Sequence, residues 1–162
     1  MPGWSPAACS RVWNLRCGRP AEAGIRDYDL FYFDASDLSA EAEQRVDDRV
    51  QRHFANLPVR IETKNQARVH TWYEGWFGAS YAASTCSRDG IDRFLVECTC
   101  VGLQARAGAP VLYAPFGLDD LYGGLLVPNA RCPAPLLYAA KAADYQHRWP
   151  WLTVLNRVSV PA

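Results

Sequence analysis

The chain has 162 residues, of which 49% are apolar and 21% charged, a composition that predicts one globular domain and excludes disordered and fibrous proteins. Its 17 basic and 17 acidic residues cancel, which excludes a strong overall field for capturing nucleic acid or a membrane. Only Lys64 and Lys141 are lysines and the other 15 basic residues are arginines, a bias that fits either phosphate recognition or GC-rich coding.

The first strand is predicted over residues 27–33 (DYDLFYF), which are rich in aromatic side chains and follow the turn-forming Gly24. A helix of about 15 residues is predicted next, because Ser39 has the chemistry of an N-cap and apolar residues recur every four positions (Ala42, Val46, Val50 and Phe54). Leu57-Pro58 is expected to end this helix.

The rest of the chain is predicted to alternate short strands with short helices. The strand candidates are four apolar or alternating segments: 59–63 (VRIET), 66–73 (QARVHTWY), 94–103 and 110–114. The last two are expected to form a hairpin around Ala107-Gly108. A loop with a short helix is expected at 74–93 and a helix at 134–145. These elements predict an α/β fold of the α+β type, with helices packed on a mixed sheet.

The six cysteines are predicted to be reduced thiols in a cytoplasmic protein. Residues 1–20 contain no apolar run long enough for a signal peptide, and no segment approaches the ~20 apolar residues of a membrane helix. Cys98 and Cys100 would share one face of a strand, but no second cysteine pair or histidine at zinc-binding spacing accompanies them. Buried free thiols are therefore favoured over a metal site.

Asp27 and Asp29 are the most informative pair of residues. In a strand, residues two apart point to one face, about 6.6 Å apart along the backbone. Two carboxylates so placed repel each other unless a cation or solvent lies between them, and magnesium favours one or two carboxylates with waters and phosphate oxygens. Two exposed acids at the start of a strand are the alternative, since an acid-x-acid pattern alone is a weak motif. The chain has no Walker loop, G-x-G-x-x-G or G-x-S-x-G motif.

Seven stretches together carry a family resemblance: VWN (12–14), GIRDYDLFYFDASDLSAEAE (24–43), NQARVHTWYEGWFG (65–78), IDRF (91–94), YAPFGLDDLY (113–122), VPN (127–129) and WPWL (149–152). In these stretches the chain resembles a family of small bacterial nucleotidyltransferase-like proteins of the polymerase-β-type nucleotidyltransferase superfamily. The order and spacing agree over nearly the whole chain from Val12 onward, so one nucleotidyltransferase-like domain over residues 1–162 is expected.

The resemblance implies a mixed sheet that carries two metal-binding, catalytic aspartates, here Asp27 and Asp29. Mg²⁺ or Mn²⁺ would bind a nucleoside triphosphate there, orient its α-phosphoryl group towards an acceptor hydroxyl and neutralise charge as pyrophosphate leaves. The superfamily usually adds a third carboxylate from a neighbouring strand. Glu62 is the candidate for this third carboxylate, and Asp34 is the alternative residue. If Glu62 does not have this role, it is expected to form an ion pair on the surface. Neutral net charge fits a small-molecule triphosphate site better than a nucleic-acid groove, and no membrane partner is expected.

Asn65, Arg68, His70 and Trp72 are further candidates for substrate binding. The last three alternate onto one face of the strand predicted at 66–73, where an arginine would hold phosphate and a tryptophan would stack on a base. Core packing is the alternative for Trp72, and a structural hydrogen bond is the alternative for His70. Asp119-Asp120 are expected to cap a helix or a turn.

One departure from the superfamily pattern lies upstream of the acidic strand. Members carry a Gly-Gly or Gly-Ser turn on a helix there, whose backbone amides approach the triphosphate closely. Here the corresponding segment is WSPAACSR, with Pro6 and with Ala8-Cys9-Ser10 as the nearest substitute. The departure predicts either a missing part of the N-terminal helix and turn or a degenerate site. A catalytically impaired protein that binds nucleotide or a partner is therefore the alternative function.

Overall fold

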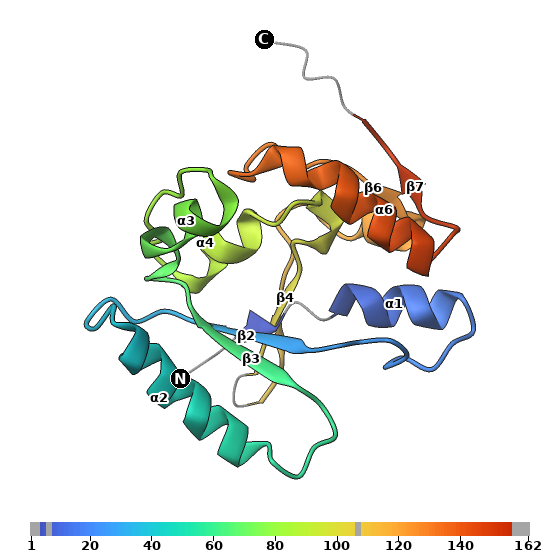
Figure 1. Ribbon diagram of the computed structural model, residues 1–162. Helices are drawn as coiled ribbons and strands as arrows, with labels where there is room; N and C mark the ends of the chain where they lie inside the picture. Colours follow the sequence, from blue (N-terminus) through green and yellow to red (C-terminus); the bar gives the residue numbers. More distant parts are fainter. Residues whose placement is uncertain (1–3, 6–7, 106–107, 157–162) are drawn as a thin grey trace.

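A five-stranded sheet with the strand order β3-β2-β1-β4-β5 forms the centre of the fold (Figure 1). The structure is a computed structural model that describes residues 4–5, 8–105 and 108–156. β2 and β3 are parallel, and the other neighbours in the sheet are antiparallel. The strands are β1 (Trp4–Ser5), β2 (Tyr28–Tyr32), β3 (Ile61–Asn65), β4 (Gly102–Gln104) and β5 (Val111–Tyr113).

Helices cover both faces of β2 and β3, with α2 on one side and α3, α4 and α6 on the other (Figure 1). The α-helices are α1 (Ala8–Arg16), α2 (Ala40–His53), α3 (Tyr73–Phe77), α4 (Ser87–Asp92), α5 (Asp119–Gly123) and α6 (Tyr138–Arg148). Short 3₁₀ turns are η1 (Val69–Thr71), η2 (Glu97–Thr99) and η3 (Pro135–Leu137). A second, parallel sheet pairs β6 (Leu125–Leu126) with β7 (Thr153–Val154). The predicted mixed sheet with packed helices is confirmed.

The β2-α2-β3 unit forms as the sequence predicts. The hydroxyl of Ser39 accepts a hydrogen bond from the backbone N–H of Ala42 at 3.1 Å and begins α2 as its N-cap. Further along α2, the carboxylates of Glu43 and Asp47 accept the backbone N–H groups of Asn65 and Thr63 in the edge strand β3, at 2.7 and 3.2 Å. The helix is therefore attached to the strand by polar contacts, and none of its own residues is buried.

The strand predicted at 66–73 is wrong, because the chain turns immediately after β3 into η1 and α3. Asn65 stabilises this turn with two hydrogen bonds. Its side-chain Oδ1 accepts the N–H of Ala67 at 3.1 Å, and its backbone carbonyl accepts the N–H of Arg68 at 3.1 Å. Residues 68, 70 and 72 consequently do not share the face of a strand.

The downstream predictions are confirmed in outline. β4 and β5 pair as the expected antiparallel hairpin, although residues 94–101 form no strand and Ala107 lies outside the described residues. The helix expected at 134–145 is η3 followed by α6, which ends before Trp149 as predicted. Asp119 and Asp120 begin α5.

The main core is built around two tryptophans from opposite ends of the chain. The rings of Trp13 and Trp149 pack edge to face with centroids 5.1 Å apart, and both side chains are fully buried. The indole N–H of Trp13 donates to the carbonyl of Leu121 at 3.0 Å, and that of Trp149 donates to the side-chain oxygen of Asn14 at 2.9 Å. The core therefore joins α1 to the C-terminal part of the fold.

All six cysteines are free thiols, as predicted, and four of them are buried. Burial raises the pKa of both Cys98 and Cys100 to about 12, which keeps these thiols protonated and unreactive. In the ranges that the structure describes, no helix is both long and apolar enough to cross a bilayer.

Gly124 ends α5 in a left-handed conformation, with φ 73°, against the ring of Trp151. A Cβ at this position would lie 2.1 Å from Cζ3 of that ring, so Gly124→Ala adds a steric clash to backbone strain and is expected to lower the free energy of unfolding by about 3 kcal/mol. Gly24→Ala is the matched control, because Gly24 has φ 67° but no atom within 4 Å of its added Cβ. That control is expected to cost about 1 kcal/mol. Urea unfolding measures both, and equal losses would contradict the packing argument.

Candidate active site

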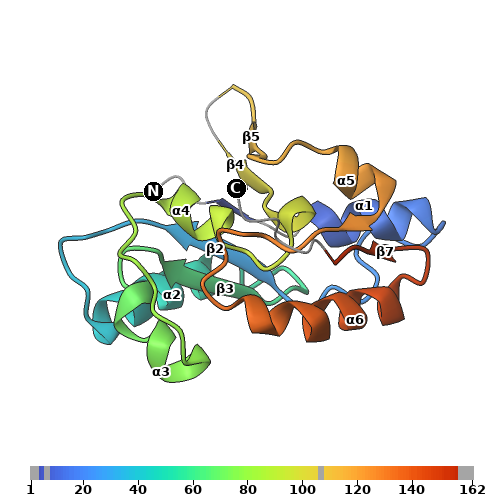
Figure 2. The same cartoon turned by 90° about the horizontal axis from the view of Figure 1, so that it is seen from above.

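A cavity of about 560 Å³ lies between the β2-β3 face and the helices that cover it. The sheet contributes Asp29, Phe31 and Lys64, and α1 contributes Cys9, Ser10 and Trp13. The opposite wall comes from α3 and α6, which both lie below β2 and β3 in the view of Figure 2. A cavity of this size accommodates a small molecule the size of a nucleotide.

Both predicted aspartates line this cavity. Asp27 immediately precedes β2 and Asp29 lies within it. The parallel register places Glu62 of β3 directly beside Asp29, so two carboxylates lie side by side in the sheet and a third, Asp27, comes just before β2.

Electrostatics in the cavity disfavour a charged Asp29. Burial, followed by the negative charges of Asp27 and Glu62, raises the pKa of Asp29 to about 6, while Lys64 and Lys141 lower it. A partly buried carboxylate that is repelled by its neighbours is stabilised when a cation binds between them. The site therefore has the charge distribution of a cation-binding centre.

The two candidates for a third carboxylate lie in different places. Glu62 pairs with Arg60 at 2.6 Å and does not line the cavity itself, although it adjoins Asp29 in the sheet. Asp34 follows the other end of β2 and accepts hydrogen bonds from the hydroxyl and backbone N–H of Ser36, which hold the pKa of Asp34 below its usual value. Of the two, Glu62 is the one next to the aspartate pair.

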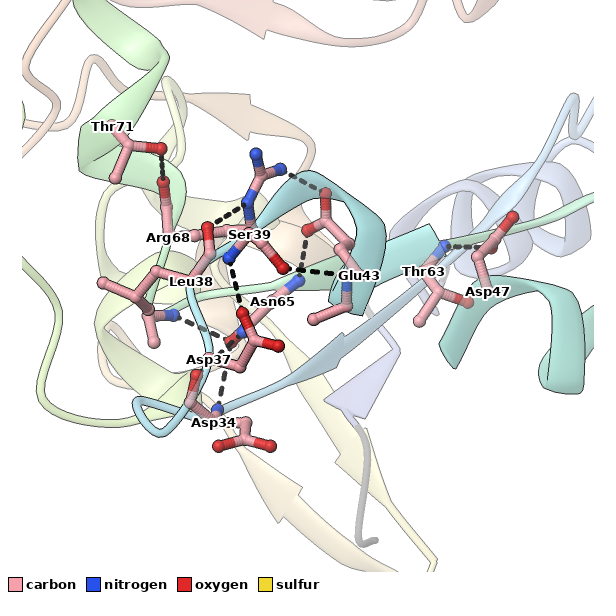
Figure 3. Close-up of polar contacts among 12 residues, drawn as sticks. Asp34, Asp37, Leu38, Ser39, Glu43, Asp47, Thr63, Asn65, Arg68 and Thr71 are labelled. Atoms are coloured by element: carbon pink, nitrogen blue, oxygen red, sulfur yellow. Dashed lines mark hydrogen bonds and ion pairs between the residues drawn. The ribbon is translucent and has the colours of Figure 1, made fainter. Parts of the chain in front are cut away.

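Asn65 and Arg68 lie outside the cavity and join β3 to α2 and the loop before it (Figure 3). The buried side chain of Asn65 accepts the N–H of Asp34 at 3.0 Å and donates to its carbonyl at 2.8 Å. The guanidinium of Arg68 pairs with Glu43 at 2.5 Å and donates to the carbonyl of Leu38 at 3.2 Å. Their donors and acceptors are engaged by the protein itself.

His70 also lies outside the cavity, in the turn η1. Its ring nitrogen Nδ1 is buried and has no hydrogen-bond partner among the described residues. Trp72, at the end of the same turn, does line the cavity and is only partly buried. Of the four residues predicted around this turn, the structure therefore brings Trp72 alone to the aspartates' cavity.

Replacing Asn65 tests its structural role. Asn65→Ala removes the hydrogen bonds to Asp34 and Ala67 and is expected to lower the free energy of unfolding by about 2 kcal/mol. Asn65→Asp keeps the acceptor for the two N–H groups and is expected to lose less. Chemical denaturation measures both variants, and an alanine variant as stable as the wild type would contradict this role.

Several cavity residues were not predicted from the sequence. Lys64 and Gln66 come from β3 and the residue after it, and Lys141 comes from α6, more than 100 residues after Asp29. The aromatic rings of Tyr73 and Phe77 come from α3, where the sequence predicts the end of a strand at Tyr73 and then a loop with a short helix. The rarity of lysine was the one sequence signal that pointed to Lys64 and Lys141.

Comparison with known proteins agrees with this geometry: a family profile described as a nucleotidyltransferase matches residues 4–154. The chain belongs to this nucleotidyltransferase family. A solved NMR structure, described as revealing a CCA-adding enzyme head domain, is 25% identical in sequence and has a TM-score of 0.75. That match covers 96% of this chain and 82% of the other. The comparison with curated proteins found no match. The nucleotidyltransferase fold predicted from the sequence is confirmed.

The segment before the acidic strand of this chain contains a helix, α1, whose first residues are Ala8, Cys9 and Ser10. Cys9 and Ser10 line the cavity, so the start of α1 lies at the site although it carries no glycine. Pro6, where the departure from the superfamily pattern begins, lies outside the described residues.

The donor set of the cavity fits a magnesium ion that is also bound by a substrate. Asp27 and Asp29 supply carboxylate oxygens, and magnesium is usually held by one or two carboxylates with substrate phosphates and water. Within the described ranges, no group of three or more His, Cys, Asp or Glu side chains forms a closed metal site.

Proposed function

We propose that the protein is a metal-dependent nucleotidyltransferase that moves a nucleoside monophosphate from a nucleoside triphosphate to a hydroxyl acceptor. The observation that carries this proposal is the pair Asp27 and Asp29, which faces a cavity of nucleotide size in a chain of the nucleotidyltransferase family. The free state of all six cysteines fits a cytoplasmic location.

Asp27 and Asp29 would hold Mg²⁺ or Mn²⁺, with Glu62 adding negative charge from the next strand. When bound, the ion neutralises charge on the phosphates and on the departing pyrophosphate. The carboxylates would orient the triphosphate through the ion that they hold. Because the carboxylates repel one another, binding of a cation between them stabilises the site.

In the proposed transfer, the oxygen of the acceptor hydroxyl forms a bond to the α-phosphorus of the triphosphate. The bond between that phosphorus and the oxygen bridging to the β-phosphate breaks, and pyrophosphate leaves with the electron pair. The hydroxyl proton passes to a carboxylate oxygen of the site, which acts as the general base.

The aromatic side chains of the cavity suit a nucleobase. Trp72, Tyr73 and Phe77 line its α3 side, with the rings of Tyr73 and Phe77 at a centroid distance of 4.6 Å. None of these rings belongs to the two buried core clusters found among the described residues. Aromatic faces at the edge of a phosphate site stack on a base, which supports a nucleoside triphosphate as donor.

One observation favours the alternative of a catalytically impaired nucleotide-binding protein. The start of α1 has Cys9 and Ser10 at the cavity, where superfamily members have glycine. Side chains at that position would keep the phosphates farther from the backbone amides than glycine does. Such a protein would bind a nucleotide and leave it uncleaved.

The deciding experiment incubates the protein with each α-³²P-labelled nucleoside triphosphate, Mg²⁺ or Mn²⁺, and small-molecule and cell-derived hydroxyl acceptors. We expect label on an acceptor together with release of unlabelled pyrophosphate. Transfer that survives the double change Asp27→Asn with Asp29→Asn would overturn the assignment of the site. Tight nucleotide binding with no transfer to any acceptor would support the impaired alternative.

A further inference from the structure

The chain uses its two kinds of basic residue in different places. Each of the five ion pairs among the described residues is formed by an arginine: Arg11–Glu22, Arg45–Asp37, Arg60–Glu62, Arg68–Glu43 and Arg131–Asp92. By contrast, both lysines of the chain, Lys64 and Lys141, line the cavity. The ion pairs of the described residues thus use arginine, while both of the scarce lysines lie at the site.

The two lysines come from opposite walls of the cavity. Lys64 lies in β3 beside Phe31 of β2 and, two residues from Glu62, on the face that carries Asp29. Lys141 lies in the middle of α6, on the helical wall. Both lower the pKa of Asp29, which places their charges close to its carboxyl group.

Neither lysine forms an ion pair with a carboxylate of the described residues. Within the part of the chain that the structure describes, neither ammonium group forms an ion pair or a hydrogen bond. The Nζ atom of Lys141 lies over the ring of Tyr145, 4.9 Å from the ring centroid. Two unpaired cations in one cavity point to an anionic ligand.

Two of the three arginines that line the cavity, Arg93 and Arg148, bind other parts of the protein. Arg93 donates to the carbonyl of Ala82 at 2.7 Å and lies over the ring of Tyr81. Arg148 donates to the carbonyl of Gly24 at 2.9 Å and lies over the ring of Trp149. Both guanidinium groups are held by the protein, whereas the two lysines, together with Arg26 of the same cavity, remain available to a substrate.

We propose that Lys64 and Lys141 together bind the polyphosphate of the substrate from two walls of the cavity, one on the sheet and one on α6. A lysine ammonium is a compact charge with three donors that rotate freely, so it can follow phosphate oxygens between ground state and products. This inference rests on the proposed function in taking the substrate to be a nucleoside triphosphate. It also requires that inorganic triphosphate bind by itself.

Amine acylation followed by mass spectrometry tests the proposal on the unmodified protein, since the sequence offers only two lysine side chains to the reagent. Inorganic triphosphate is expected to slow the labelling of both Lys64 and Lys141, whereas a nucleoside without phosphates is expected to leave it unchanged. An unchanged labelling rate at either lysine under saturating triphosphate would overturn the proposal.

Variants give a second measurement. Lys64→Met and Lys141→Met are each expected to weaken the binding of inorganic triphosphate roughly tenfold or more, as loss of a charge-assisted hydrogen bond requires. Arg52→Met is the matched control, because Arg52 is an exposed cation near the end of α2 that lies away from the cavity. Equal effects of the three variants would show a non-specific field and contradict the lysine pair.

The outcomes also separate this inference from the proposed function. Lysines protected by triphosphate in a protein that transfers no labelled nucleotide would uphold the lysine pair and reject the transferase. Transfer of label with both lysines unprotected would uphold the transferase and reject the lysine pair.

Discussion

Asp29→Asn is expected to lower the rate of nucleotidyl transfer roughly a thousandfold, because loss of a metal ligand removes several kcal/mol of stabilisation from the transition state and each 1.36 kcal/mol is tenfold in rate. Asparagine preserves the shape of the side chain in the cavity but removes its charge. The measurement is kcat with α-³²P-labelled triphosphate at saturating Mg²⁺.

Asp48→Asn is the matched control for this loss. Asp48 is an exposed carboxylate on α2 that accepts a hydrogen bond from Gln44 at 2.9 Å and lies outside the cavity. Its replacement is expected to leave the rate unchanged. An Asp29→Asn protein that retains more than about a tenth of the wild-type rate would contradict a metal-binding role for Asp29.

Asp29→Asn is also expected to stabilise the metal-free protein at pH 8 by about 1–2 kcal/mol. Folding raises the pKa of Asp29 from 3.8 to about 6, chiefly through burial, and each unit corresponds to 1.36 kcal/mol before a reduction for partial solvent exposure. Removing the charge removes this penalty.

The sign follows from proton binding. Between pH 4 and 6 the folded state binds more protons at Asp29 than the unfolded state, so this group lowers stability as pH rises through that window. The gain from Asp29→Asn is therefore expected to be largest above pH 7 and to disappear below pH 4. Urea unfolding in EDTA at pH 3.5 and pH 8 measures it, and a variant less stable than the wild type at pH 8 would contradict the repulsion.

These opposite effects on rate and stability are typical of a residue that is retained for function. A charged Asp29 is unfavourable for the empty fold because it is buried and because its neighbours include Asp27 and Glu62. The same carboxylates make the cavity attractive to a cation, so part of the cost in stability has the same cause as the proposed chemistry.

Much of the first half of the fold is predictable because its signals are local. The aromatic-rich run after Gly24 marks β2, and Ser39 with the four-residue apolar repeat marks α2. The family resemblance, rather than a local pattern, makes Glu62 the candidate from a neighbouring strand, and the parallel register of β2 and β3 then places it beside Asp29.

The walls of the cavity are less predictable because they depend on contacts between distant segments. The alternation of polar and apolar residues at 66–73 favours a strand, but the side chain of Asn65 hydrogen-bonds to the following backbone and starts a turn instead. Lys141 reaches the site only through the packing of α6 over the sheet. No sequence period connects it to Asp29.

The most direct test of a metal–nucleotide site at Asp27 and Asp29 is Mn²⁺ binding followed by electron paramagnetic resonance, with and without a non-hydrolysable nucleoside triphosphate analogue. The wild-type protein is expected to bind Mn²⁺ and to bind it more tightly when the nucleotide is present, because both ligands share the cavity. The protein carrying Asp27→Asn and Asp29→Asn is expected to lose both effects. Equal Mn²⁺ affinity of the two proteins, or a Mn²⁺ affinity that does not change when the nucleotide is added, would contradict a metal–nucleotide site at Asp27 and Asp29.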